Sequence, residues 1–312
     1  MSAATFKAWI SAARLRTLPL SISGIITGTA YGYGVIQTSE TTFNIFVPML
    51  ALLTTLGFQV LSNFANDYGD GVKGTDNENR VGPVRALQSG VIKPHQMKLG
   101  IIITSIISFL SAVLLIYVSL GSKAILVSLF FLVLGVLAIW AAIKYTVGDN
   151  AYGYRGLGDL FVFIFFGPVS VLGIYYLLTL EMEVILLLPA ITIGLLSVAV
   201  LNLNNMRDME SDALVGKNTI VVKMGITAAK KLHYALIGIA FMSAFIIALL
   251  SYNSGFINSI AAFLPLIAFL PVMLHVVNVF KNDAPALLDP ELKKVALATF
   301  FYALITLATV IY

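Results

Sequence analysis

The sequence has no cysteine and little charge: 11% of its 312 residues are Asp, Glu, Lys or Arg, and three are histidine. The lack of cysteine excludes disulfide bonds and thiolate metal sites. Globular proteins carry roughly 25% charged residues, whereas this chain is 59% hydrophobic with a mean hydropathy of +0.95. We therefore expect an integral membrane protein with a single transmembrane domain, residues 1–312. His95, His233 and His275 show no ligand spacing and are interpreted as structural.

Long apolar runs predict how often the chain crosses the bilayer. A spanning helix needs ~20 mostly apolar residues, and nine segments satisfy this rule. They cover residues 18–37, 45–65, 97–119, 123–145, 158–178, 183–203, 231–251, 256–280 and 294–312. The predicted fold is all-α, with two four-helix repeats plus one helix around a central cavity.

Basic residues are distributed unevenly among the loops. Apart from Lys123, the 19 Lys and Arg residues lie in the N-terminal segment or in regions 66–98, 144–155, 207–231 and 281–294, all on one side of the membrane by this count. The positive-inside rule then predicts a cytoplasmic N-terminus, an outside C-terminus and an active site facing the cytoplasm, in the cell (inner) membrane. Topology accounts for the pI near 9.1, so it does not indicate nucleic-acid binding.

The basic N-terminus could instead belong to a cleavable signal peptide. No A-x-A-like site closes a short apolar core there. We therefore interpret this segment as leading into a retained first span.

Polar residues gather where the second span ends. Asn63, Asn66, Asp67 and Asp70 fall at i, i+3, i+4 and i+7, so they share one helix face. Amide and carboxylate oxygens are the ligands of hard divalent cations. A single acid here would be no more than a solvated helix end.

A basic segment follows. We expect the helix to break after Asp70, because this region contains Gly69, Gly71, Gly74, Gly82 and Pro83. Lys73, Arg80 and Arg85 then lie on an irregular loop. This loop could be a flexible basic segment, or a cap whose cations bind a diphosphate. We favour the cap for Lys73 and Arg80.

A second acidic cluster ends the sixth span. Asn204, Asp208 and Asp212 lie at i, i+4 and i+8, again on one helix face, with Arg207 and Lys217 close by. Two matched clusters on one side of the membrane predict a metal–diphosphate site. Mg²⁺ fits this pattern because it keeps waters and binds few carboxylates together with substrate phosphates.

Two other segments have open interpretations. Tyr145, Tyr152, Tyr154 and Arg155 could form an interfacial aromatic belt or the wall of an aromatic-acceptor site. Arg14 could be a cytoplasmic anchor or bind the acceptor. The glycine-rich residues 24–34 predict close helix packing rather than a phosphate loop.

The sequences NDYGD at 66–70 and RDMESD at 207–212 resemble the two aspartate-rich motifs of the UbiA superfamily of intramembrane prenyltransferases. Together with KYTVGDNAYGYRGLGDLFVFIFFGP and GKNT, they are most similar to its menaquinone-pathway branch. The resemblance covers residues from about 9 to 225. No motif in the last three spans contributes to it.

The resemblance implies a role for particular side chains. Metal ligands would be Asn66, Asp67, Asp70, Asp76, Asp208 and Asp212, of which Asp67, Asp70, Asp208 and Asp212 are catalytic. Gly74 occupies the place of a further aspartate of the superfamily, and Asp76 is the next acid. Diphosphate ligands would be Asn63, Lys73, Arg80, Arg85, Arg207 and Lys217. Acceptor contacts would be Arg14, Tyr145, Tyr154 and Arg155.

The resemblance also implies a reaction. A polyprenyl group would pass from polyprenyl diphosphate to 1,4-dihydroxy-2-naphthoate within the lipid bilayer, with Mg²⁺ as cofactor and loss of CO₂ and diphosphate, giving demethylmenaquinol. Another aromatic acceptor, such as 4-hydroxybenzoate or homogentisate, is the alternative within this class. A cation-coupled transporter is the alternative of another class. The gathering of acids and bases at one face of nearly uncharged spans favours the enzyme.

Overall fold

The computed structural model describes residues 3–39, 42–75, 84–122, 124–257, 259–282 and 284–312, and over these residues it is helical without strands. The first half comprises α1 Ala3–Ala13, η1 Leu15–Thr17, α2 Leu18–Gln37, α3 Phe46–Lys73, α4 Pro94–Leu120, α5 Ile125–Lys144 and η2 Tyr152–Arg155. Next come α6 Gly158–Ile164, η3 Phe165–Val169, α7 Ser170–Thr179, η4 Val184–Leu186 and α8 Leu187–Arg207. The chain ends with α9 Met209–Leu214, α10 Ile220–Met224, α11 Ile226–Asn253, η5 Ile260–Phe269, α12 Leu270–Lys281, η6 Pro285–Leu287 and α13 Leu288–Ile311.

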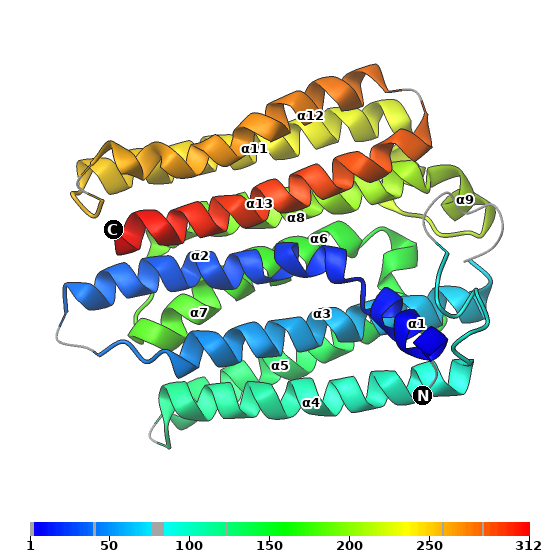
Figure 1. Cartoon of the computed structure of the whole chain (residues 1–312), viewed down its shortest axis with the longest axis horizontal. Coiled ribbons are helices and arrows are strands. Elements are labelled where there is room, and N and C mark those ends of the chain that lie inside the picture. The colour runs from blue at the N-terminus through cyan, green and yellow to red at the C-terminus, as the bar shows by residue number, and fades with distance from the viewer. Residues whose placement is uncertain (1–2, 40–41, 76–83, 123, 258, 283) are drawn as a thin grey trace.

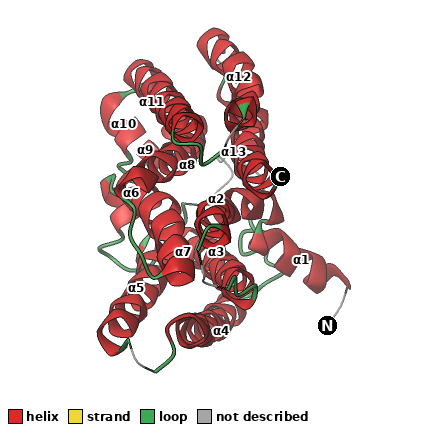
Figure 2. Cartoon of the chain, turned by 90° about the vertical axis from the view of Figure 1, so that its left-hand side faces the viewer, coloured by secondary structure: helices red, strands yellow, loops and turns green. Residues whose placement is uncertain are grey.

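The long helices run side by side along one axis of the molecule (Figure 1). α3, α4 and α5 pack together, and α8 pairs with α11 in the other half. Figure 2 shows these two groups on opposite sides of α2. The last helix, α13, packs against both α2 and α8 and so joins the two halves. The predicted all-α architecture is confirmed.

Within the described parts of the chain, eight helical segments are long and apolar enough to cross a membrane, by length and composition. They are Phe46–Lys73, Pro94–Leu120, Ile125–Lys144, Gly158–Thr179, Val184–Arg207, Ile226–Asn253, Ile260–Lys281 and Pro285–Ile311. α2 is not among them because glycine and hydroxyl residues lower its hydropathy, although it matches the predicted 18–37 segment and lies along the same axis. The multi-pass fold is confirmed, and the count of nine spans stays a prediction.

One span is not a regular α-helix. α6 ends at Ile164, a π-helical turn covers Phe165–Val169, and α7 begins at Ser170. Pro168 lies in this turn. A proline has no N–H to donate, and a wider turn accommodates the missing hydrogen bond.

Close packing explains glycine in α2. A Cβ atom on Gly28 would lie 2.3 Å from the carbonyl oxygen of Val171 on α7, a backbone atom that cannot turn away. Gly28 therefore lets the α2 and α7 backbones approach, as membrane helices with small interfacial residues do. This agrees with the packing role predicted for residues 24–34.

A buried polar cluster links the last three helices. The Nε2 atoms of His233 and His275 lie 2.7 Å apart, and His275 Nδ1 lies 2.8 Å from Glu291 Oε2. These side chains come from α11, α12 and α13 and are all buried. The structural interpretation of both histidines is consistent with this link, and His95 is exposed on α4.

We expect Gly28→Ala to destabilise the protein, because the added methyl group must force α2 away from α7. Overpacking of this kind costs ~1–3 kcal/mol. Gly238→Ala is the matched control: Gly238 is also inside a long helix, α11, but a Cβ there meets no described atom within 4 Å. Thermal unfolding in detergent, followed by circular dichroism, should show a lower Tm for Gly28→Ala alone. Equal Tm values would contradict the close-packing argument.

Candidate active site

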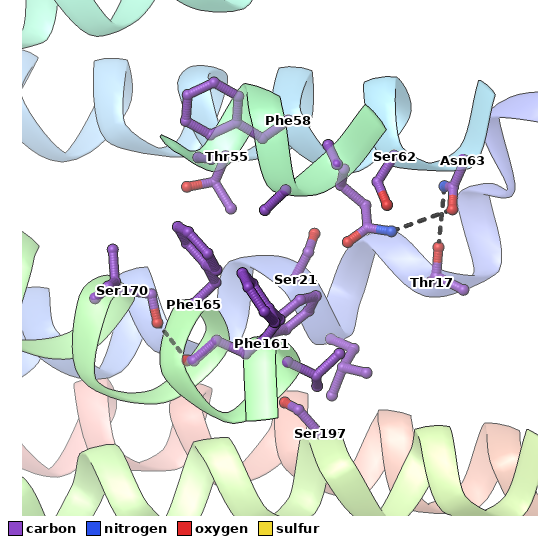
Figure 3. Close-up of a pocket in the computed structure, with 18 of the residues that line it drawn as sticks. Thr17, Ser21, Thr55, Phe58, Ser62, Asn63, Phe161, Phe165, Ser170 and Ser197 are labelled. Atoms are coloured by element: carbon purple, nitrogen blue, oxygen red, sulfur yellow. Dashed lines mark hydrogen bonds between the residues drawn. The ribbon is translucent and has the colours of Figure 1, made fainter. Parts of the chain in front are cut away.

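A cavity of about 520 Å³ lies between the two halves of the molecule. α2, α3, α5, α7 and α8 provide most of its wall, and the first residues of α13 complete it. Figure 3 shows Thr55 of α3 pointing toward Phe165 across this space. The deep part is apolar and includes Ile25, Ala51, Leu115, Ile116, Phe131, Ile174 and Leu177. The polar end includes Arg14, Arg16, Asn63, Asn66, Asp70, Arg85, Asn204, Lys217, Asp289 and Lys293.

The first acidic motif is on the last turns of α3, which extends further than predicted. The expected break after Asp70 is wrong: α3 continues to Lys73 and ends at Gly74, whose φ of 74° closes the helix in the left-handed region. Gly69 serves packing instead, because a Cβ there would lie 2.5 Å from Thr146 Oγ1. The extra turn places Lys73, which was predicted on the loop, at the end of the helix.

The acids of this motif point in two directions. Asn66 and Asp70 line the cavity. Asp67 is buried at 1% exposure and does not line it. Its Oδ2 accepts a hydrogen bond of 3.2 Å from the backbone N–H of Ala86. Asp67 thereby fixes the segment after the motif, which carries Arg85 to the cavity wall.

Asn63 links α3 to the N-terminal segment. Its side-chain amide donates to the carbonyl of Ala13 at 2.8 Å. It also donates to Thr17 Oγ1 at 3.4 Å (Figure 3). Gln59 donates to its Oδ1 at 3.2 Å. These bonds hold η1 against the cavity, so the geometry favours a positioning role for Asn63 over the predicted diphosphate contact.

The second acidic motif spans a helix junction. α8 ends at Arg207 and α9 begins at Met209, so the predicted single helix from Asn204 to Asp212 is wrong. Asp208 is the residue between them, with φ −97° and ψ 8°. Asp212 N–H still donates to the Asp208 carbonyl at 2.8 Å, which keeps the two acids one turn apart.

The guanidinium of Arg207 is hydrogen-bonded to neighbouring side chains. It is 2% exposed, and its guanidinium donates to both carboxylate oxygens of Asp208 at 2.8 and 2.7 Å. It also donates to Asn204 Oδ1 at 2.8 Å and to Asp289 Oδ1 at 2.5 Å. Arg207 does not line the cavity, so the geometry favours a role in fixing Asp208 over the predicted diphosphate contact.

Lys217 joins the two motifs. Its Nζ lies 3.3 Å from Asp212 Oδ1 and 4.0 Å from Asp70 Oδ2, and the side chain lines the cavity. Burial raises the pKa of Asp212 to about 6, although the Lys217 ammonium opposes this shift. Burial lowers the pKa of Lys217, but the Asp70 and Asp212 carboxylates outweigh it and keep the ammonium charged. The Lys217 ammonium therefore lies between the two acidic motifs.

A tyrosine orients Asp70. The hydroxyl of Tyr154 donates to Asp70 Oδ1 at 2.8 Å and shares a hydrogen bond with Thr75. The Lys73 ammonium lies 4.0 Å from the centre of the Tyr154 ring, a cation–π contact. Burial first, and then the Asp70 charge, raise the pKa of Tyr154 above its ordinary value. Its hydroxyl therefore stays protonated and able to donate.

The predicted acceptor residues separate into two groups. Arg14 and Tyr145 line the cavity, and burial raises the pKa of Tyr145 to about 12. Tyr154 and Arg155 do not line it. Arg155 is exposed, and its carbonyl accepts a hydrogen bond of 2.7 Å from Lys223. Asp76 and Arg80 lie outside the described residues.

Sequence reasoning missed the contribution of the last helix. Asp289 and Lys293, one turn apart on α13, both line the cavity. Asp289 Oδ2 also lies 3.3 Å from Arg16 Nη1, which links η1 to the second motif. The sequence signal was an acid and a base at i and i+4 at the start of an apolar helix, which is easily taken for a solvated helix end.

The donor atoms at the polar end suit a divalent cation. Asn66 and Asp70 present oxygen atoms on the cavity wall. Asp67 and Asp212 lie behind this wall, where Asp67 Oδ1 and Asp212 Oδ2 are buried without a hydrogen-bond partner among the described residues, a costly state for a carboxylate oxygen. No three acidic or histidine side chains of the described chain form a ready-made metal cluster. Mg²⁺ needs no such cluster, since one or two carboxylates, waters and substrate phosphates suffice.

The chain is similar to known prenyltransferases. A model of the UbiA prenyltransferase family matches residues 25–309. The 1,4-dihydroxy-2-naphthoate octaprenyltransferase of Haemophilus influenzae is 43% identical over 293 residues, 93% of this chain and 91% of that protein. The Escherichia coli enzyme of the same name is 41% identical over 288 residues, 92% and 90% of the two chains.

A solved structure shares the fold. A UbiA homologue from Archaeoglobus fulgidus, bound to DMAPP and Mg²⁺, superposes with a TM-score of 0.62 over 96% of this chain and 99% of that one. The two sequences are 16% identical. At this identity the likeness concerns the fold alone, which it confirms.

We expect Arg207→Met to destabilise the protein strongly, because the Asp208 carboxylate would stay buried without its cation. Breaking a buried ion pair costs ~3–5 kcal/mol. Arg155→Met removes the same charge from an exposed side chain and should change stability by less than ~0.5 kcal/mol. Denaturant unfolding in mixed micelles measures both variants. Equal losses would show that the Arg207 network adds no stability.

Proposed function

We propose that this chain, which belongs to the UbiA prenyltransferase family, transfers a polyprenyl group from its diphosphate to 1,4-dihydroxy-2-naphthoate, releasing CO₂ and diphosphate and giving demethylmenaquinol. The relatives named for this acceptor cover more than nine-tenths of the chain. The observation that carries the proposal is the bridge Asp70–Lys217–Asp212, in which Asp70 and Lys217 line the polar end of a cavity whose deep wall is apolar.

The cavity matches the two parts of such a donor. A polyprenyl chain is hydrocarbon and fits the deep apolar wall, which includes Ile25, Leu115 and Phe131. A diphosphate is a polyanion and fits the end where Lys217 and Arg85 lie. The bond to be broken would then lie between these ends, beside Phe161 and Phe165.

Asp70, Asp212 and Asn66 are the side chains that would hold Mg²⁺. Asp67 instead binds the segment that carries Arg85, and Asp208 is held by Arg207. When bound, Mg²⁺ supplies Lewis-acid stabilisation of the negative charge on the departing diphosphate. Lys217 contributes a second positive charge at the same place. Tyr154 holds Asp70 in position through its hydroxyl.

The chemistry at carbon needs an environment without water. As the carbon–oxygen bond of the donor breaks, its electron pair leaves with the diphosphate and positive charge develops on the allylic carbon. Phe161, Phe165 and Phe166 border the cavity there and offer aromatic faces to a cation while excluding water. The ring carbon bearing the carboxylate attacks this carbon. Loss of CO₂ returns the electron pair to the ring and restores its aromaticity.

The acceptor would bind where its carboxylate meets a cation. Arg14 lines the polar end, and Tyr145, at the end of α5, also lines the cavity. These two residues keep their predicted acceptor role in this proposal. The exposed Arg155 does not.

The multi-pass membrane fold is established by the family and the apolar helices. We further infer that the polar end faces the cytoplasm of a cell (inner) membrane. The basic residues near this end, such as Arg14, Lys73 and Lys217, support this orientation through the positive-inside rule. The transporter alternative has no support in the family assignment.

We expect purified protein in nanodiscs to prenylate 1,4-dihydroxy-2-naphthoate in the presence of Mg²⁺, with a product that lacks the carboxyl group by mass spectrometry. EDTA should abolish turnover and added Mg²⁺ should restore it, because the diphosphate leaves only when its charge is stabilised. 4-Hydroxybenzoate is the control acceptor. Turnover of hydroxybenzoate instead would reject the proposed acceptor and retain the prenyl transfer.

We expect Asp70→Asn and Asp212→Asn each to lower kcat/KM by ~100-fold or more, because each removes charge from the cation site while keeping the side-chain shape. Glu181→Gln, an exposed acid in the loop before η4, should be unchanged. Steady-state assays at saturating Mg²⁺ distinguish these cases. Full turnover by either Asn variant would remove the basis of the proposed site.

A further inference from the structure

A second cavity of about 420 Å³ lies outside the active site, where α11 begins, α12 ends and α13 begins. Its described lining residues are Met206, Ile226, Thr227, Lys230, Lys231, Tyr234, Phe280, Asn282, Ala284, Pro285 and Leu288. We propose that this cavity binds the phosphate headgroup of an anionic phospholipid. The inference is independent of the proposed reaction.

The charged residues among the described lining of the cavity are both basic. Lys230 and Lys231 both line it, and none of its described lining residues is acidic. One N–H of the Lys230 ammonium donates to the carbonyl of Asn282 at 2.6 Å. This bond fixes the ammonium at the wall and leaves two of its three donors for a ligand. Basic pockets between membrane helices are suited to lipid headgroups.

The start of α11 adds further donors. This helix is 28 residues long, and no side chain of the described residues caps its N-terminus at Gly225. Its first residues, Ile226 and Thr227, line the cavity, so the positive end of the helix dipole and unpaired N–H groups lie beside the two lysines. Tyr234 also lines it and has a buried hydroxyl with no partner among the described residues. Lysines, helix end and tyrosine together match a phosphate.

The surroundings favour a lipid over a free phosphate. Phe280 lines the cavity and is 72% exposed, and Ile226 is 38% exposed. Further along α12, Leu270, Met273, Leu274 and Val277 are exposed apolar side chains. This apolar surface continues from the cavity along the helix, which is the direction that acyl chains take from a headgroup at the membrane interface. An inorganic phosphate would make no contact with this apolar surface.

The cavity shares a wall with the active site. Met206 and Leu288 line it, and their chain neighbours Arg207 and Asp289 form the ion pair behind the second acidic motif. A bound headgroup would therefore contact the helix ends that hold Arg207 in place.

The test is native mass spectrometry of delipidated full-length protein in a neutral detergent, titrated with phosphatidylglycerol, phosphatidylcholine or inorganic phosphate. The wild type should bind phosphatidylglycerol more tightly than phosphatidylcholine. In Lys230→Gln/Lys231→Gln the affinity for phosphatidylglycerol should fall by about 25-fold, since each lysine near a lipid surface contributes about a fivefold change. Lys230→Arg/Lys231→Arg keeps both charges and should retain binding.

The matched control is Lys7→Gln/Lys98→Gln, which removes two exposed lysines at the same end of the helices but outside the cavity. It should bind phosphatidylglycerol like the wild type. Equal weakening by both double variants would reduce the effect to net charge and overturn the site. Inorganic phosphate that displaces the lipid at matched concentration would show that the cavity takes a free anion, which also overturns the lipid assignment.

Discussion

The structure depends on keeping charged groups paired where water is scarce. Asp70 and Asp212 are both buried, and they come from opposite halves of the chain. An isolated buried carboxylate is costly, so each needs a cation, and Lys217 lies within 4.0 Å of both. This pairing explains why the two halves meet at their polar ends. It also leaves carboxylate charge at the place where a metal and a diphosphate would bind.

The polar end is held together by contacts among side chains on its wall and by Arg207 and Asp208, which lie behind it. Arg207 fixes Asp208 and contacts Asp289 on the last helix, which also contacts Arg16 next to the first. Asn63 ties α3 to the same N-terminal segment. These contacts connect segments that are far apart in sequence. A substitution that breaks any of these contacts should therefore also move the acidic side chains, because preorganised sites depend on the residues that orient them.

The helices and side-chain positions that have a local signature in the sequence were predicted correctly. The apolar run of residues 18–37 became α2, and the spacing of Asn66 and Asp70 placed both on the cavity wall. Prediction from the sequence failed where packing against distant residues determines the local structure. Gly69 and Gly71 were interpreted as helix breakers, but a close neighbour such as Thr146 makes glycine necessary inside α3. Asp289 was missed since its partners, Arg207 and Arg16, are distant in sequence and only the fold brings them together.

The same separation of charge explains why such chemistry suits a membrane helix bundle. Charged side chains occupy one end of the cavity, whereas the walls beyond Phe161 and Phe165 carry apolar and hydroxyl groups. A polyanion binds at the charged end because the opposite charges are there. A hydrocarbon chain binds along the apolar walls because moving it into water would expose apolar surface. An allylic cation formed between them meets aromatic faces and little water. The change from charged to apolar walls along the cavity thus both orients the substrate and protects its reactive carbon from water.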